Sequence, residues 1–234
     1  GFGAPLRRVL GLWVEEFCEV YRDRIGLPWY CFGYPTTIKP RLMKAMKAAN
    51  CSMLFMGIDS GDEQVRKMIY QRPMKDELIY DKARIIHEHG IRSFMSTIYG
   101  SPLETPEQMW KTLDMVDRVK PHQCSGNVFY PLPKTHLYDL VVEEGYLDER
   151  GEQRVREGAS SFHQDSILNH PHGDLAEMLA KVTPVYVKAP KWAKPWLRRM
   201  VDRRMKRTAQ ALYAVLIPFT FSTIGKEAVR ITLA

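Results

Sequence analysis

Apolar runs along this chain alternate with segments in which apolar residues recur at helical spacing. Four of the runs predict strands, at residues 28–34, 52–58, 92–99 and 125–131. They are apolar almost throughout rather than at every second position, which is typical of strands that are covered on both faces. Because helical segments separate them, we expect a parallel sheet or barrel with helices packed outside it.

The predicted helices have recognisable ends. Thr105 and Gln108 form a capping-box pattern that begins a helix over residues 106–120. Gly90 follows a second helical segment, residues 77–89, at the position where helices commonly end. These signals support the alternation of strand and helix independently of the hydrophobic pattern.

Glycines and polar residues gather where the predicted strands end. The four ends are Gly-Tyr-Pro at 33–35, Asp-Ser-Gly at 59–61, Gly-Ser-Pro at 100–102 and Tyr-Pro-Leu-Pro at 130–133. Turn chemistry explains any one of them, but the carboxyl ends of parallel strands meet at one rim, so four together favour a ligand site. Asp59 and Ser60 offer oxygen acceptors suited to hydroxyl groups such as those of a ribose.

The composition is that of a globular protein, and its charge is unevenly placed. Of the 234 residues, 45% are hydrophobic and 26% are charged, which is enough for a core of ordinary size. The net charge is +7, yet the segment from Lys188 to Arg207 holds nine basic residues and one Asp, a local +8, which leaves −1 for the rest. We therefore do not expect a nucleic-acid-binding surface spread over the domain.

Neither the cysteines nor the histidines have the spacing of a metal site. The cysteines are four isolated residues: Cys18, Cys31, Cys51 and Cys124. Isolated thiols without a secretory signal indicate a reducing compartment, so we expect a cytoplasmic protein. His163, His170 and His172, near Asp165, are expected to be hydrogen-bonded loop residues rather than metal ligands.

Glu104 lies at the predicted rim, directly before a predicted helix. A carboxylate at that place could act as a general base, but its position near a helix start favours a structural role. We therefore assign no catalytic residue from the sequence.

Two segments at strand ends resemble motifs of the radical S-adenosylmethionine superfamily, especially its cobalamin-associated branch. The first resembles the family's Gly-x-Glu-Ser-Gly element and reads GIDSGDEQVRK; the second resembles its Gly-x-Pro-Gly-Glu-Thr element and reads IYGSPLETPEQ. The likeness extends from Pro28 to Asp148, through the helices between these elements and the loop after them. The chain departs from the pattern at Asp59, where relatives have Glu, and at Leu103, where they have Gly.

The resemblance implies an α/β fold, a partial TIM-like (β/α) barrel with parallel strands over residues 1–148. A helical, basic C-terminal extension would occupy residues 149–234. The rim of the barrel would bind S-adenosylmethionine, whose reductive cleavage gives a 5′-deoxyadenosyl radical that modifies a substrate. No residue identifies that substrate, and we expect a small or lipid-like molecule.

The resemblance also implies six cofactor-binding residues. Asp59 and Ser60, at the end of the second strand, would contact the ribose or amino-acid part of S-adenosylmethionine. Ser96, Ile98 and Gly100, on and after the third strand, would lie along the adenosyl group. Tyr130, after the fourth strand, would line the adenine side.

The family's four-iron, four-sulfur (4Fe-4S) cluster is held by a Cys-x-x-x-Cys-x-x-Cys motif, which this sequence lacks. In the family that motif precedes every element found here, so the resemblance implies a barrel truncated at its N-terminus, with the cluster ligands upstream. We expect this chain alone to be inactive, and cobalamin is a further cofactor that the branch suggests. The alternative is a non-catalytic membrane- or partner-binding module on a barrel scaffold.

The basic segment from Lys188 to Arg207 has its own hypotheses. Leu197, Met200 and Val201 recur there at helical spacing, and the 15-residue run ALYAVLIPFTFSTIG follows, shorter than the ~20 residues that span a bilayer. An amphipathic helix of this kind is suited to the interface of an anionic membrane, which would make the protein peripheral. Docking onto the barrel and a basic nucleic-acid arm are the other two interpretations.

Overall fold

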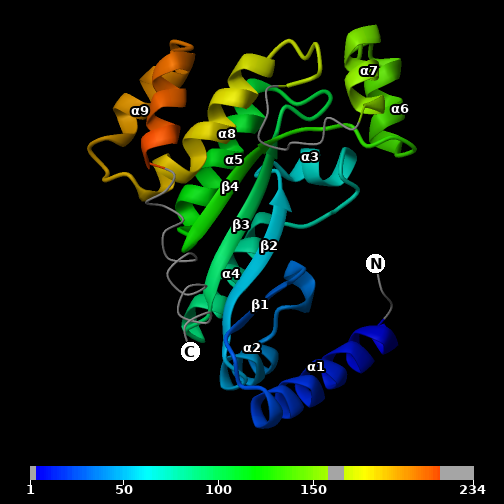
Figure 1. Ribbon diagram of the computed structural model, residues 1–234, viewed down its shortest axis with the longest axis vertical. Helices are drawn as coiled ribbons and strands as arrows, with labels where there is room; N and C mark the ends of the chain where they lie inside the picture. The colour runs from blue at the N-terminus through cyan, green and yellow to red at the C-terminus, as the bar shows by residue number, and fades with distance from the viewer. Residues whose placement is uncertain (1–3, 158–165, 217–234) are drawn as a thin grey trace.

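The computed structural model describes residues 4–157 and 166–216, with side chains from residue 12 onward (Figure 1). Its centre is a parallel sheet of four strands in the order β1-β2-β3-β4. The strands are β1 (Trp29–Phe32), β2 (Cys51–Asp59), β3 (Arg92–Tyr99) and β4 (Gln123–Val128). All four predicted strands are present, and the first is shorter than predicted because the chain turns into the 3-10 helix η1 (Pro35–Thr37).

Helices precede, connect and follow the strands. They are α1 (Ala4–Arg24), α2 (Pro40–Ala48), α3 (Glu63–Met68), α4 (Asp76–Glu88), α5 (Pro106–Val119), α6 (His136–Glu143), α7 (Glu149–Arg156), α8 (Gly173–Lys188) and α9 (Lys194–Asp202), with a further helical segment at 206–216. The capping box at Thr105 and Gln108 is confirmed. Gly90 has a φ of +66°, as expected for a residue that ends a helix in the left-handed region.

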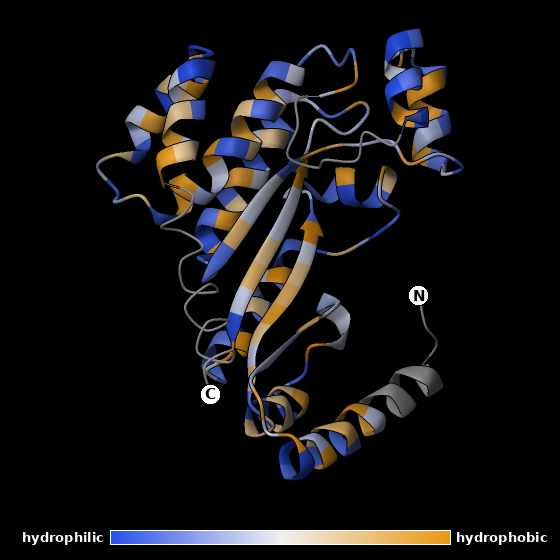
Figure 2. Ribbon diagram, viewed as in Figure 1, coloured by the Kyte–Doolittle hydropathy of each residue, from blue (hydrophilic) through white to orange (hydrophobic). Residues whose placement is uncertain are grey.

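The main core lies between one face of the sheet and helices α2, α4 and α5. Leu54, Met56 and Ile58 of β2 point into it and are buried, together with Ile79 and Ile86 of α4. Burying one such side chain stabilises the fold by about 1.5 to 3 kcal/mol. Figure 2 shows apolar residues along β2 and β3, and alternating polar and apolar residues on the helices around them.

The opposite face of the sheet, called the open face below, carries the side chains that alternate with the core residues. An aromatic row crosses this face. Phe55 stacks on Phe94 with 4.6 Å between ring centroids, and the rings of Tyr30 and Phe32 lie 5.3 and 5.1 Å from that of Phe55. Phe32 is 82% exposed. The apolar runs led us to expect strands that are covered on both faces. On the open face, the apolar residues of these runs are the members of the aromatic row.

Helix α8 covers the last strand and ties the carboxyl-terminal half of the chain to the sheet. A Cβ atom at Gly126 would come within 2.6 Å of the backbone of Ala180, so β4 and α8 are in direct contact. The hydroxyl of Tyr99 lies 2.7 Å from that of Thr183, inside a second core that α8 and α9 complete. The predicted extension is therefore helical in its described part, and the domain boundary at residue 148 stays a prediction.

Candidate functional site

Strand β2 ends at the rim with a fixed carboxylate. Asp59 has a φ of +58°, in the left-handed region that Asp tolerates better than most residues. Its Oδ2 accepts a hydrogen bond from Nη1 of Arg72 at 2.6 Å. Burial raises the pKa of Asp59, and the Arg72 guanidinium opposes that increase. The carboxylate is thus half-buried and held at the edge of the open face.

The next two residues bind the β2 loop to α5 rather than reaching outward. Ser60 is fully buried, and its Oγ lies 3.3 Å from Oγ1 of Thr112 while accepting from the backbone N–H of Asp62 at 3.1 Å. The N–H of Gly61 donates to the same Thr112 oxygen at 2.7 Å, and a Cβ at Gly61 would lie 2.4 Å from the Thr112 Cα. Gly61 is therefore required by close packing, and the cofactor contact of Ser60 stays a prediction.

Asp62 completes this loop as the N-cap of α3. Its Oδ1 accepts from the backbone N–H groups of Gln64 and Val65 at 3.0 and 3.1 Å, and its Oδ2 accepts from Lys111 at 2.8 Å. Burial alone would raise the pKa of Asp62, but Lys111 and the two N–H groups lower it below its ordinary value. The sequence Asp-Ser-Gly-Asp thus positions one outward carboxylate and anchors the turn behind it.

Polar side chains of three neighbouring strands form a row on the open face. The strand register aligns Gly57 with Ser96 and Ser96 with Ser125. The amide of Asn127 donates to Oγ of Ser96 at 3.0 Å and to the carbonyl of Thr97 at 2.9 Å. Sequence reasoning missed Ser125 and Asn127; their spacing of two residues within a strand was the available signal, because such residues share a face.

The remaining predicted site residues lie beyond this row, towards the carboxyl ends of β3 and β4. Ile98 and Tyr130 each pack against a small apolar core that includes residues of α6 and α7. Gly100 has a φ of +75°, and a Cβ there would lie 2.8 Å from Cβ of Ala176. The structure therefore brings Asp59, Ser96 and Ile98 to the open face. Gly100, which has no side chain, can offer only its backbone to a ligand there.

Glu104 holds the turn that follows β3. It is 2% exposed, and its Oε2 accepts from the backbone N–H groups of Gly100 and Ser101 at 2.9 and 3.1 Å. Its Oε1 is buried and has no hydrogen-bond partner among the described residues. Burial raises the pKa of Glu104 to about 8, so the carboxyl group is largely protonated at neutral pH. Leu103, where relatives have Gly, has a φ of +63° in this turn.

His170 lies near this turn, next to His172. Its Nδ1 accepts from the backbone N–H of His172 at 3.0 Å, and burial lowers its pKa, with a further contribution from His172. Within residues 4–157 and 166–216, no three His, Cys, Asp or Glu side chains are placed to hold a metal ion. His163 and Asp165 lie outside the described residues.

The cysteines do not fit an iron–sulfur cluster. Cys18, Cys51 and Cys124 are buried in the core, and Cys31 is half-buried. Burial raises the pKa of Cys18 to about 11 and that of Cys124 to about 12, whereas iron is bound by thiolates. A 4Fe-4S cluster therefore has no ligand set among these four residues.

We expect this 234-residue chain, incubated anaerobically with iron and sulfide and then desalted, to retain no stoichiometric 4Fe-4S cluster. The reason is that burial in the core disfavours the thiolate forms that iron requires. Iron and sulfide analysis with the visible absorption spectrum measures the result. A stable cluster in the parent chain, lost when Cys18, Cys31 and Cys51 are changed to Ser, would contradict this expectation.

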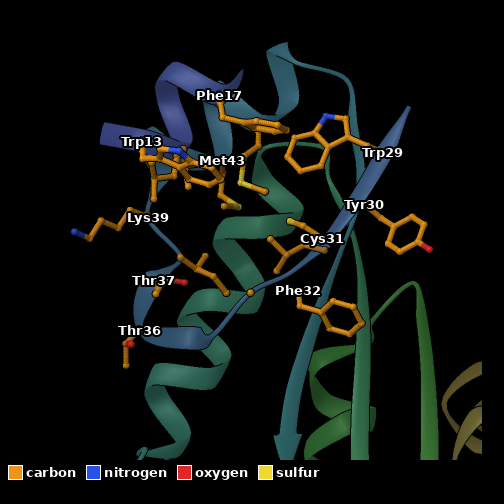
Figure 3. Close-up of a pocket in the computed structure, with 16 residues that line it drawn as sticks. Trp13, Phe17, Trp29, Tyr30, Cys31, Phe32, Thr36, Thr37, Lys39 and Met43 are labelled. Carbon is orange, nitrogen blue, oxygen red and sulfur yellow. The ribbon is translucent and has the colours of Figure 1, made fainter. Parts of the chain in front are cut away.

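A separate apolar cavity of about 520 Å³ lies on the helix side of β1. Figure 3 shows Trp13, Phe17 and Met43 from α1 and α2 on one side of β1 and Phe32 on the other, and all four line the cavity. None of the six predicted cofactor-binding residues lines this cavity. Its walls are largely apolar, so it does not suit the polar groups of S-adenosylmethionine.

Comparison with known proteins relates the first half of the chain to one protein family. Residues 6–116 match the model of the Radical SAM superfamily. An uncharacterized methyltransferase of Pyrococcus horikoshii is 21% identical over 134 residues, 57% of this chain and 29% of that protein. The hopanoid C-2 methylase of Rhodopseudomonas palustris is 26% identical over 119 residues, 50% of this chain and 23% of that protein. The chain thus spans less than a third of the length of these relatives.

Among solved structures, the fold is similar to that of coproporphyrinogen III oxidase (HemN) from Escherichia coli, a radical SAM enzyme. The TM-score is 0.52 at 18% identity, covering 74% of this chain and 36% of the other. The predicted resemblance to the radical SAM superfamily and the α/β fold with a parallel, partly barrel-like sheet are therefore confirmed. The six cofactor-binding residues stay predictions.

Proposed function

We propose that this chain forms the part of a radical SAM enzyme that binds S-adenosylmethionine, because residues 6–116 match the model of that superfamily. The observation that carries the proposal is the polar row on the open face. Asp59, Ser96 and Asn127 lie towards the carboxyl ends of three neighbouring parallel strands, where ligands bind in folds of this kind.

The chemistry of the row suits the polar edge of S-adenosylmethionine. The Asp59 carboxylate can accept hydrogen bonds from ribose hydroxyls or from the amino group, because ionised carboxylates are acceptors only. Ser96 and Asn127 both donate and accept, and Ile98 with Tyr130 offers apolar surface for a planar base. Gly57 leaves room on the open face between Phe55 and Asp59, since it has no side chain.

The proposed role of this chain is to bind and orient S-adenosylmethionine. Reductive cleavage needs an electron, which a 4Fe-4S cluster supplies in this family, and the four cysteines here do not fit such a cluster. We therefore assign no electron-transfer step to these residues. The enzyme would act through a cluster held by other protein segments.

Two relatives named as a methyltransferase and a hopanoid methylase support methyl transfer as the reaction class. The second relative's name also agrees with a lipid-like substrate for this chain. Cobalamin as a second cofactor belongs to the same proposal. Substrate, cobalamin and methyl transfer all concern the whole enzyme, of which this chain spans a minor part.

We expect Asp59→Asn to weaken binding of S-adenosylmethionine by about 5- to 150-fold, or about 1 to 3 kcal/mol, since it removes a charged acceptor. Asn tolerates the left-handed conformation of residue 59, so the turn should persist. Calorimetric titration of the chain with S-adenosylmethionine measures the affinity. Asp81→Asn, on the outer side of α4, is the matched control.

Equal affinities of the parent chain and Asp59→Asn would remove Asp59 from the site. If the parent chain does not bind S-adenosylmethionine at millimolar concentration, the proposed function of this chain fails. The alternative, a non-catalytic module on a barrel scaffold, would then be favoured. A melting curve by circular dichroism separates lost binding from lost folding.

A further inference from the structure

Helix α9 presents three faces with different surroundings. Its first face carries Leu197, Met200 and Val201, which are all buried in the core formed with α5 and α8. This face fixes the helix on the body of the protein. The docking interpretation of the basic segment is therefore correct for α9 itself.

The second face carries basic residues that are paired with acids of α5. Lys194 forms an ion pair with Asp117, and Arg198 forms one with Asp114 at 2.7 Å. The Arg198 guanidinium also lies over the Trp110 ring, 4.5 Å from its centroid. These two cations are used within the protein and are not available to a partner.

The third face points outward and combines tryptophan with arginine. Trp192, Trp196, Arg199 and Arg203 follow one another at spacings of four, three and four residues, which places them on one side of a helix and its preceding turn. Trp192 is 83% exposed and Trp196 is 52% exposed. In the part of the chain that the structure describes, no acidic side chain pairs with Arg199 or Arg203.

We propose that this outward face, Trp192, Trp196, Arg199 and Arg203, docks the protein onto an anionic lipid bilayer. Tryptophan is favoured at the membrane–water interface because its ring is apolar while its indole N–H remains hydrogen-bonded. Arginines beside it meet lipid phosphates with bidentate hydrogen bonds. Exposed Lys191, next to Trp192, adds a third cation without a described acidic partner.

Other partners fit this face less well. A second copy would bring arginine against arginine across a two-fold interface, which is repulsive. Nucleic acid would pair with the arginines, but the apolar surface beside them suits a lipid bilayer better than a phosphate backbone. The tryptophans also border a hollow of about 660 Å³ lined by Val185, Leu197 and Leu212, so the apolar surface extends beyond the two rings.

Contact with the bilayer would be peripheral for the described part of the chain. No helix within residues 4–157 and 166–216 has the length and apolar character needed to cross a membrane. Each basic residue near an anionic surface contributes about 1 kcal/mol, and the attraction weakens as the Debye length falls from about 10 Å at 0.1 M salt to about 3 Å at 1 M.

The test is co-sedimentation of the full 234-residue chain with vesicles of phosphatidylcholine, with and without phosphatidylglycerol. We expect binding only to the anionic vesicles, and loss of that binding at about 1 M salt. Arg199→Gln with Arg203→Gln should weaken it about 30-fold, from about 1 kcal/mol per cation. Trp192→Ala with Trp196→Ala should weaken it roughly tenfold and abolish the blue shift of tryptophan fluorescence on vesicles.

The control pair is Lys44→Gln with Lys67→Gln, which removes the same charge from exposed positions on α2 and α3. It should bind within about twofold of the parent, since α2 and α3 lie on other parts of the molecule than α9 (Figure 1). All the changed side chains are exposed, and circular dichroism checks that each variant is folded.

Three results would overturn the proposal. The parent chain could fail to bind anionic vesicles at low salt, or the Lys pair could lose as much binding as the Arg pair. Alternatively, the Trp variant could bind normally while the parent binds a DNA duplex equally well, which would indicate a general polyanion surface. No outcome depends on binding of S-adenosylmethionine, so this proposal stands or fails independently of the proposed function.

Discussion

Replacing Arg66 by methionine is expected to lower the free energy of unfolding by about 3 to 5 kcal/mol. The Arg66 side chain is fully buried behind the β2 loop. Its Nη1 donates to the carbonyl of Ser60 at 2.9 Å, its Nε and Nη2 donate to that of Met74 at 3.1 and 2.9 Å, and Nη2 also pairs with Asp76. Methionine fills similar space but leaves these acceptors without donors.

Urea unfolding followed by circular dichroism measures this loss. Arg84→Met on the exposed side of α4 is the matched control; it removes ion pairs with Asp81 and Glu88 and should cost at most about 1 kcal/mol. Arg66→Lys should lie between the two, because an ammonium group cannot span both carbonyls in the same plane. If Arg66→Met is no less stable than Arg84→Met, Arg66 does not hold the loop.

Replacing Glu104 by glutamine is expected to stabilise the protein at alkaline pH and to leave its stability nearly unchanged near pH 5. Burial raises the pKa of Glu104 from its ordinary 4.5 to about 8 in the folded state, against the backbone N–H groups of Ser101 and Gly100 that favour the ionised form. Nearby Asp62 raises it further. Glutamine is neutral at every pH and resembles the protonated acid in shape.

The sign follows from the two pKa values. Below pH 4.5 Glu104 is protonated in both the unfolded and the folded state, so it adds no penalty. As the pH rises towards about 8, the unfolded chain releases the proton while the folded protein keeps it, and stability falls. Because one pKa unit is worth about 1.4 kcal/mol, the full difference is about 5 kcal/mol, reached above the folded pKa.

The free energy of unfolding of the parent and of Glu104→Gln is measured in urea between pH 5 and pH 9. The difference between the two proteins reports Glu104 alone, because all other titratable groups are present in both. The two proteins should be similar at pH 5, and the variant should be more stable by several kcal/mol at pH 9. Parallel pH profiles would show that Glu104 is ionised in the fold at neutral pH. The result also bears on the site, because Glu104 fixes the backbone of Gly100.

The order of the elements and the location of the rim follow from local patterns in the sequence. Hydrophobic runs and helix caps are local signals, since they depend on residues within a few positions of one another. They placed the four strands, the capping box at Thr105 and the polar strand end at Asp59. The family resemblance also depended on motifs contained in short segments, and residues 6–116 match that family.

Which of these residues point to the open face and which point into the protein depends on the folded chain. Adjacent residues at a strand end can point in opposite directions, so sequence could not separate outward Asp59 from Ser60, whose hydroxyl meets Thr112 of α5. Asn127 joins the row through Ser96, a residue of the neighbouring strand. Such partners depend on strand register, which is fixed only when the sheet forms.

Tertiary contacts also determine which of the cations are buried or paired. The local sequence does not distinguish Arg66 from the other cations of the chain, and only the fold buries it. In the basic segment, the sequence determined the local excess of charge, but the acids Asp114 and Asp117 of α5 decided that Arg198 and Lys194 are paired. Arg199 and Arg203 remain on the outer side because the helix turns them away from those acids, a difference that only packing against α5 and α8 creates.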